Sequence, residues 1–169
     1  MYGNKNVNSE SHCHTLGILV NDEPGVLTRI SGMFMKRNFN IKTITVGASN
    51  LKGISKITVS FYGNDEVYEQ LVKQLNKLID VIKTTDLSGS TSVVRELALI
   101  KISVKNVQEQ NQIMNYCRIH KARVVNVTQE DMIIEIVGKS DKIDTFYKLA
   151  STFGIKDISR TGVTAISRK

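Results

Sequence analysis

Residues 16–46 read LGILVNDEPGVLTRISGMFMKRNFNIKTITV. An alternating apolar run leads into a polar turn that contains the only proline of the chain, Pro24, followed by Gly25. After this turn, apolar residues recur at the spacing of one helix face, which predicts a helix over residues 26–37. Proline suits the first turn of a helix because the N–H that it lacks would be unpaired there. The segment therefore predicts a strand, a tight turn and a helix in succession.

The start of this helix is a candidate site for a small anion. Gly25 carries no Cβ, so a ligand can approach its backbone closely. The N–H groups of Gly25, Val26 and Leu27 lack intrahelical acceptors and carry the positive end of the helix dipole, which favours a carboxylate. Asn40 follows the helix and offers both a donor and an acceptor to an amino acid. The alternative is an ordinary helix start, because Pro and Gly are frequent in turns of every kind.

The order strand, helix, strand, strand, helix, strand is predicted twice along the chain. In the first half these elements cover residues 14–20, 26–37, 41–48, 54–61, 65–78 and 81–87. In the second half they cover residues 97–102, 107–120, 123–128, 132–137, 141–153 and 155–159. Each half is therefore predicted to be a ferredoxin-like βαββαβ unit, an α+β fold with an antiparallel sheet and both helices on one face.

The small residues 88–92 predict a linker between the two halves. The predicted boundaries are a flexible N-terminal extension over residues 1–13, a first domain over 14–88, a linker over 89–94 and a second domain over 95–169. Units of this size bury only a small core, so we expect pairing between domains or chains. Edge strands of such units commonly join across a dimer, which hides their exposed backbone groups.

Composition narrows the classes of function. The net charge of +7 raises the question of an acidic partner, but the basic residues are scattered, so no nucleic-acid partner is predicted. No uncharged apolar run approaches the roughly 18 residues of a membrane span, and the first residues lack the apolar centre of a secretory leader. The two cysteines, Cys13 and Cys117, cannot build a disulfide framework, which favours a reducing, cytoplasmic setting.

Two short patterns contain soft metal ligands, His12-Cys13-His14 and Cys117-x-x-His120. The first trio is too compact for all of its members to bind one ion comfortably. Cys117 is more simply a small apolar residue of a core. No metal site is therefore predicted.

Catalytic and RNA-binding patterns are missing from the sequence. Residues 52–59 follow the spacing of an RNA-recognition strand, but the ring positions hold Ile54, Lys56 and Val59, which cannot stack on bases. There is no Gly-rich phosphate loop, nucleophile elbow or helix with paired His ligands. No catalytic residue is predicted, and we do not expect the chain to be an enzyme by itself.

Separate segments along nearly the whole chain after His14 carry a resemblance to one family. They are residues 22–30, 32–34, 39–41, 45–47, 74–81, 95–101, 154–156, 159–163 and 167–168. In this order they resemble the small, regulatory subunit of acetohydroxyacid (acetolactate) synthase, an enzyme of branched-chain amino acid biosynthesis. The resemblance implies an N-terminal ACT domain followed by a C-terminal ferredoxin-like domain, in agreement with the repeat described above.

The resemblance also implies a ligand. ACT domains of the family form a homodimer and bind a branched-chain amino acid, typically valine, at the subunit interface for feedback inhibition. Carried over by position, the effector-binding residues are Asp22, Gly25, Val26, Leu27, Asn40 and Ile41. The choice among valine, leucine and isoleucine stays open.

A partner enzyme is implied in the same way. The family's small subunit raises the activity of a catalytic large subunit, which condenses two pyruvates, or pyruvate with 2-oxobutyrate. Thiamine diphosphate, Mg²⁺ and FAD belong to that partner, and no cofactor is expected on this chain. The alternative is a stand-alone ACT-domain amino-acid sensor that acts on another target, although no helix-turn-helix or basic arm is visible.

The chain departs from the family pattern at two positions beside the predicted site. Asp22 stands where similar proteins often have Asn, so a carboxylate replaces a neutral amide. Lys42 stands where they often have Glu, which adds a positive charge beside Asn40. These two changes bear on valine sensitivity and ligand preference.

Overall fold

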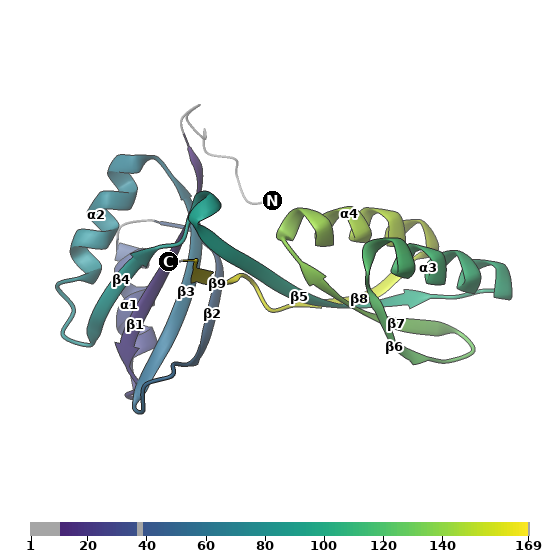
Figure 1. Ribbon diagram of the computed structural model, residues 1–169, viewed down its shortest axis with the longest axis horizontal. Coiled ribbons are helices and arrows are strands. Elements are labelled where there is room, and N and C mark those ends of the chain that lie inside the picture. Colours follow the sequence, from purple (N-terminus) through teal and green to yellow (C-terminus); the bar gives the residue numbers. More distant parts are fainter. Residues whose placement is uncertain (1–10, 37–38, 169) are drawn as a thin grey trace. The chain divides into compact units, whose positions relative to one another are not determined.

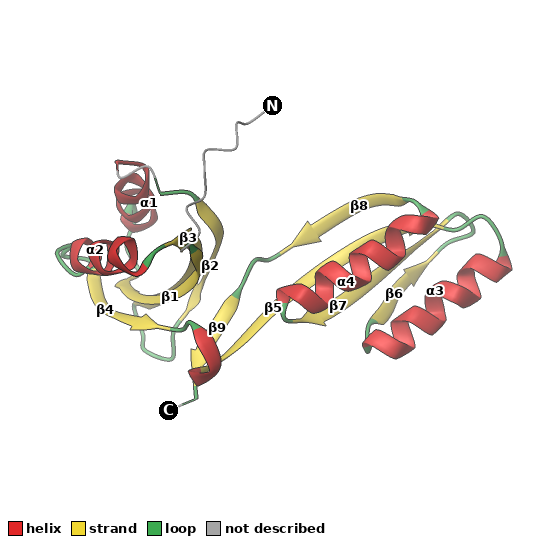
Figure 2. Cartoon of the chain, turned by 90° about the horizontal axis from the view of Figure 1, so that it is seen from above, coloured by secondary structure: helices red, strands yellow, loops and turns green. Residues whose placement is uncertain are grey.

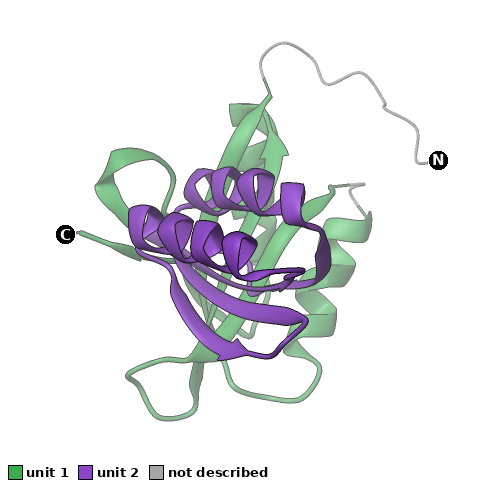
Figure 3. Cartoon of the chain, turned by 90° about the vertical axis from the view of Figure 1, so that its right-hand side faces the viewer, with its two compact units in different colours: residues 1–93, 165–169 green, residues 94–164 purple. Residues whose placement is uncertain are grey.

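The computed structural model describes residues 11–36 and 39–168 (Figure 1). Most of the predicted N-terminal extension, and Arg37 at the end of the predicted first helix, lie outside these ranges. Contacts divide the chain into two compact units, Met1–Val93 with Ala165–Lys169, and Val94–Thr164 (Figure 3). Within the described ranges, no helix is both long enough and apolar enough to cross a membrane.

The first unit is an antiparallel sheet with two helices. Its elements are β1 (His12–Asn21), α1 (Val26–Lys36), β2 (Ile41–Ala48), β3 (Ile54–Gly63), α2 (Asp65–Leu75), β4 (Val81–Asp86) and a 3₁₀ turn (Gly89–Thr91). The strand order is β2-β3-β1-β4, so β2 and β4 are the outer strands of this sheet. Both helices lie on the same side of the sheet (Figure 2). This is the predicted ferredoxin-like topology.

Alternation along the two central strands builds the core of this unit. Because successive residues of a strand point to opposite faces, every second side chain of β1 and β3 faces α1 and α2. The fully buried members from the strands and helices are Leu16, Ile18, Val20, Ile57, Val59, Phe61, Ile30, Phe34, Leu71 and Leu75. The helix α2 begins after Asn64, whose side-chain oxygen accepts a hydrogen bond from the Val67 N–H at 2.9 Å.

The second unit repeats the pattern. Its elements are β5 (Ser92–Ser103), α3 (Val107–His120), β6 (Arg123–Val127), β7 (Asp131–Gly138), α4 (Ser140–Ala150), a 3₁₀ turn (Ser151–Phe153) and β8 (Ile155–Arg160). The strand order is β6-β7-β5-β8, again ferredoxin-like. The predicted α+β class with two such units is therefore confirmed. As predicted, Cys117 packs in the apolar core, where burial raises the pKa of its thiol to about 11.

A few element boundaries differ from those predicted. Strand β1 begins two residues before the predicted start, because His12 and Cys13 still pair with the end of β3. The helix α2 ends at Leu75, after which the chain closes successive tight turns up to Val81. An additional strand that pairs with β5, β9 (Thr164–Ser167), was not predicted.

Candidate functional site

The polar loop after β1 is a β-turn that leads into α1. The Val26 N–H donates to the Glu23 carbonyl at 3.4 Å, and Gly25 has a φ of 86°. Proline followed by a residue with positive φ is the arrangement of a type II turn, which explains the pair Pro24-Gly25. The Gly25 carbonyl then accepts from the Arg29 N–H at 3.0 Å, the first hydrogen bond of the helix. Pro24 therefore lies in the turn that precedes α1 and not in its first helical turn.

The free amides at this helix start are shifted along the chain from the predicted trio. The Val26 amide is used in the turn. In the described part of the chain, the N–H groups of Leu27 and Thr28 have no acceptor in the preceding loop. They point out of the N-terminus of α1 and carry its positive partial charge. An anion at this point would meet Leu27 and Thr28 first, and Thr28 was not among the predicted site residues.

Arg29 places a cation beside the same helix start. Its Nε lies 2.6 Å from Oδ2 of Asp80, a carboxylate whose side chain is only 8% exposed, and this hydrogen bond raises the pKa of the guanidinium. A Cβ added at Gly25 would lie 3.2 Å from Nη1 of Arg29. Glycine at this position therefore serves the positive φ of the turn and also leaves room for the guanidinium. Arg29 and Asp80 are 51 residues apart in sequence, so the pair could not be inferred from spacing.

Asp22 lies next to the hairpin between β2 and β3. Its N–H donates to the Gly53 carbonyl at 2.9 Å, and its Oδ1 accepts from the Ser55 hydroxyl at 3.1 Å. These bonds hold the exposed carboxylate at the end of β1, close in sequence to the turn. A carboxylate accepts hydrogen bonds and donates none, so this side chain suits an ammonium group.

Asn40 and Ile41 lie at the opposite end of the sheet. Ile41 pairs with Phe61 on β3, whereas Asn21, just before Asp22, pairs with Ile54 on the same strand. Seven residues of strand separate the two positions, which is about 23 Å. The predicted site residues therefore form two groups, and a single chain does not bring Asn40 to the start of α1.

The charge of Lys42 is directed toward an aromatic neighbour. Its Nζ donates to the Tyr62 hydroxyl at 3.0 Å and lies 4.9 Å from the centre of that ring. The positive charge of Lys42 is thus held beside Tyr62 of β3.

The face of the first sheet opposite the helices carries a hollow of 660 Å³. Its lining includes Gly17 and Leu19 of β1, Lys56 of β3, Lys83 of β4 and Ile166 of β9. None of the predicted effector-binding residues lines it. The hollow is separate from the helix start and from Asn40.

Two ferredoxin-like units, the first with an open helix start after a Pro-Gly turn, place the chain in the class of ACT-domain proteins. Residues 16–83 match a family model described as an AHAS small subunit-like ACT domain, and residues 95–169 match one described as the small subunit of acetolactate synthase. The chain belongs to the acetolactate synthase small-subunit family.

Similar proteins align with this chain over almost its full length. A probable acetolactate synthase small subunit of Methanothermobacter thermautotrophicus is 44% identical over 162 residues, covering 96% of both chains. The acetolactate synthase small subunit of Mycolicibacterium smegmatis is 41% identical over 155 residues, covering 92% of this chain and 91% of that protein. A crystal structure of the small subunit from Thermotoga maritima superimposes with a TM-score of 0.87 at 34% identity, covering 94% and 98%.

Proposed function

We propose that this chain binds a branched-chain amino acid between the ACT domains of two copies and thereby regulates a catalytic acetolactate synthase subunit. The observation that carries the proposal is the division of the predicted site into two groups, about 23 Å apart along one sheet. A ligand as small as valine cannot contact both groups in one chain. It can do so only where a second copy supplies Asn40.

The topology of the first unit supports such pairing. Strand β2 is an outer strand of this sheet, and outer strands readily accept another strand. Three large apolar side chains on α1 and β2 are exposed: Leu27 and Met35 of α1, and Val46 of β2. A second copy that covers them would remove apolar surface from water, which favours association.

Two-fold pairing would bring the two groups together. Both β1 and β2 are antiparallel to β3, so they run in the same direction, and Ala48 pairs with the Ser55 that holds Asp22. If two β2 strands pair antiparallel about a two-fold axis, the Asn40 end of one copy meets the Ala48 end of the other. That end is also where α1 begins, so the site is completed twice in the dimer.

The chemistry of the two groups fits an α-amino acid. The amides of Leu27 and Thr28, with the Arg29 guanidinium alongside, would hold the carboxylate. Asp22 and the amide oxygen of Asn40 would accept from the ammonium group. Leu27 and Ile41 would contact an aliphatic side chain, and these contacts leave valine, leucine and isoleucine as candidates.

The regulated activity would reside on the partner. In this proposal the large subunit carries thiamine diphosphate, Mg²⁺ and FAD, and the small subunit raises its activity in the cytoplasm. The ligand would inhibit by favouring one dimer arrangement over another, for which the coupling free energy is typically about 1–3 kcal/mol. Such coupling requires unequal affinity for the two arrangements.

The test is reconstitution of the holoenzyme from this chain and its large subunit, with titration of valine, leucine and isoleucine. We expect Asn40→Ala and Gly25→Asp to abolish inhibition and to leave stimulation of the large subunit intact. Asn115→Ala, at an exposed position of α3, is the matched control and should be inhibited normally. Normal inhibition of the Gly25→Asp holoenzyme would refute the site. Failure of the chain to retain the large subunit in a pull-down would favour a stand-alone sensor instead.

A further inference from the structure

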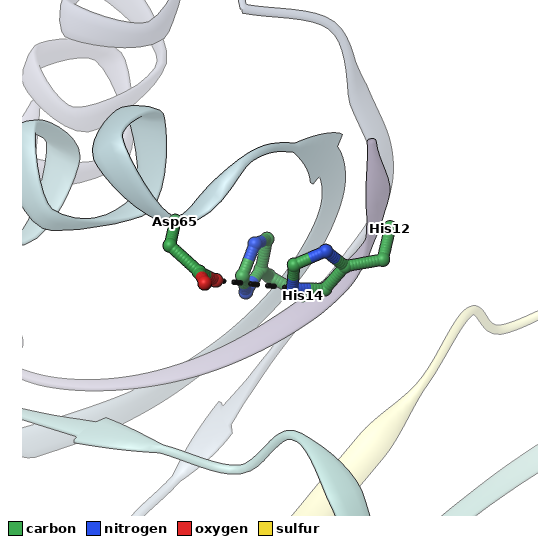
Figure 4. Close-up of side chains that lie close together, drawn as sticks. All are labelled: His12, His14 and Asp65. Carbon is green, nitrogen blue, oxygen red and sulfur yellow. Dashed lines mark ion pairs between the residues drawn. The ribbon is translucent and has the colours of Figure 1, made fainter. Parts of the chain in front are cut away.

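Three potential metal ligands converge where β1 begins and α2 begins. His12 and His14 are two residues apart on β1, so their side chains leave the same face of the strand. Asp65 is the first residue of α2, and Gly63, two residues before it, pairs with His12 across the sheet. One nitrogen of each histidine and one Asp65 oxygen all lie within 4.8 Å of one another (Figure 4).

The His14 side chain is buried and one of its nitrogens has no partner. The residue is only 4% exposed, and its Nε2 makes no hydrogen bond within the described part of the chain. Buried polar atoms are nearly always hydrogen-bonded or bound to an ion, so an orphan nitrogen of this kind needs a partner. The ring faces the His12 ring and the Asp65 carboxylate in Figure 4.

Aromatic neighbours hold the His14 ring in place. It stacks on Tyr68, with 4.7 Å between ring centres, and on Phe61 at 5.5 Å. Burial, followed by the nearby His12, lowers the pKa of His14. The negative charges that act on this ring are Asp65 and Asp86 of β4, and both favour a cation beside it.

The two exposed members already have the spacing of ligands on one ion. Nε2 of His12 and Oδ1 of Asp65 are 3.2 Å apart. Bonds of about 2.0–2.2 Å in tetrahedral geometry separate two ligand atoms by about 3.3 Å. Both side chains are more than half exposed, so an ion can enter from water. Movement of these two exposed side chains toward His14 would complete three bonds.

We propose that His12, His14 and Asp65 bind one Zn²⁺ ion, with water at the fourth position. Two imidazoles and one carboxylate form a donor set that suits zinc. His12, Cys13 and His14 are too close together in sequence for all three to bind one ion. In β1, however, Cys13 points to the face opposite the two histidines, and Asp65 supplies the third ligand in its place. The bound ion would link the first strand to the second helix of this unit and so stabilise its folded state.

The test uses the full chain after a chelator has removed bound metal. Zn²⁺ is titrated into this protein, and binding is measured by isothermal titration calorimetry. We expect one ion per chain, and a rise in the midpoint of thermal unfolding when zinc is added. Asp65→Asn should weaken binding by about 100-fold or more, since even changes outside the ligand shell often cost 10–100-fold. Asp65 is exposed, so this variant leaves the core intact.

Matched controls isolate the site. Asp141→Asn removes the equivalent first-turn carboxylate of α4, and Cys13→Ser removes the exposed thiol; both should keep the affinity of the unchanged chain. His14→Ala should abolish the zinc-dependent rise in the unfolding midpoint. Unchanged affinity in Asp65→Asn, loss of affinity in Cys13→Ser, or no zinc binding by the unchanged chain would each overturn the proposal.

Discussion

Replacement of Gly25 by alanine separates the turn's backbone requirement from its role in ligand binding. The positive φ of 86° is strained for any residue with a Cβ, and the left-handed region costs such a residue about 1–2 kcal/mol. The new methyl group would also lie 3.2 Å from Nη1 of Arg29. The guanidinium is the flexible end of its side chain, so it should move aside with little further loss of stability. That movement takes a cation away from the helix start.

Gly89→Ala is the matched control, because Gly89 has a φ of 74° and a Cβ there would meet no atom within 4 Å. Both variants should lower the free energy of unfolding of the first unit by about 1–2 kcal/mol in urea titrations followed by circular dichroism. Only Gly25→Ala should weaken valine binding in calorimetry, by about 10-fold, as expected for loss of a contact worth about 1.4 kcal/mol. Equal valine affinity in the two variants would refute the assignment of Gly25 and Arg29 to the site.

Two further predictions concern the second unit. Glu96 is 3% exposed and binds Arg160 at 2.6 and 3.0 Å, so Glu96→Gln should destabilise this unit by about 2 kcal/mol in urea. Burial raises the pKa of Glu96, but hydrogen bonds from Arg160 and Ser140 outweigh burial and lower this pKa from its usual value. The Glu96 carboxylate therefore contributes its full stabilisation above its unfolded pKa, and this contribution is lost as pH falls through its folded pKa. If the free energy of unfolding of Glu96→Gln fell as steeply at acidic pH as that of the unchanged chain, this reasoning would be contradicted. The Cys117 thiol, with its pKa raised to about 11, should react with a disulfide reagent only on unfolding, whereas Cys13 is exposed; prompt labelling of both thiols would be the contrary result.

Periodicity made most of the fold predictable. The alternation of Ile57, Val59 and Phe61 identifies a strand with one buried face, and the predicted limits of β2 and α3 agree with the structure. The missed strand β9 has only four residues, too few for a pattern, and it exists because β5 offers it a partner. Short elements of this kind depend on tertiary pairing more than on local sequence.

The candidate sites were predictable only in part. Their motifs can be recognised in short stretches of sequence, but the contacts between distant segments depend on the fold. The Pro-Gly turn and Asn40 can be recognised in sequence, yet only the strand register places them at opposite ends of the sheet. The ion pair between Arg29 and Asp80 could not be predicted either, because the two residues are far apart in the sequence. His12 and His14 form a local pattern with Cys13 in the sequence, whereas the carboxylate near them comes from Asp65, at the start of α2.

A site shared between two copies can be tested most directly by mixing two inactive variants. Asn40→Ala and Gly25→Asp should each bind no valine as homodimers. In a hybrid dimer, one site combines two intact halves and the other combines both defects. After equilibration of an equal mixture, calorimetry should therefore recover about a quarter of the valine sites of the unchanged chain. If the mixture binds no valine although hybrid dimers have formed, the site does not lie between two copies.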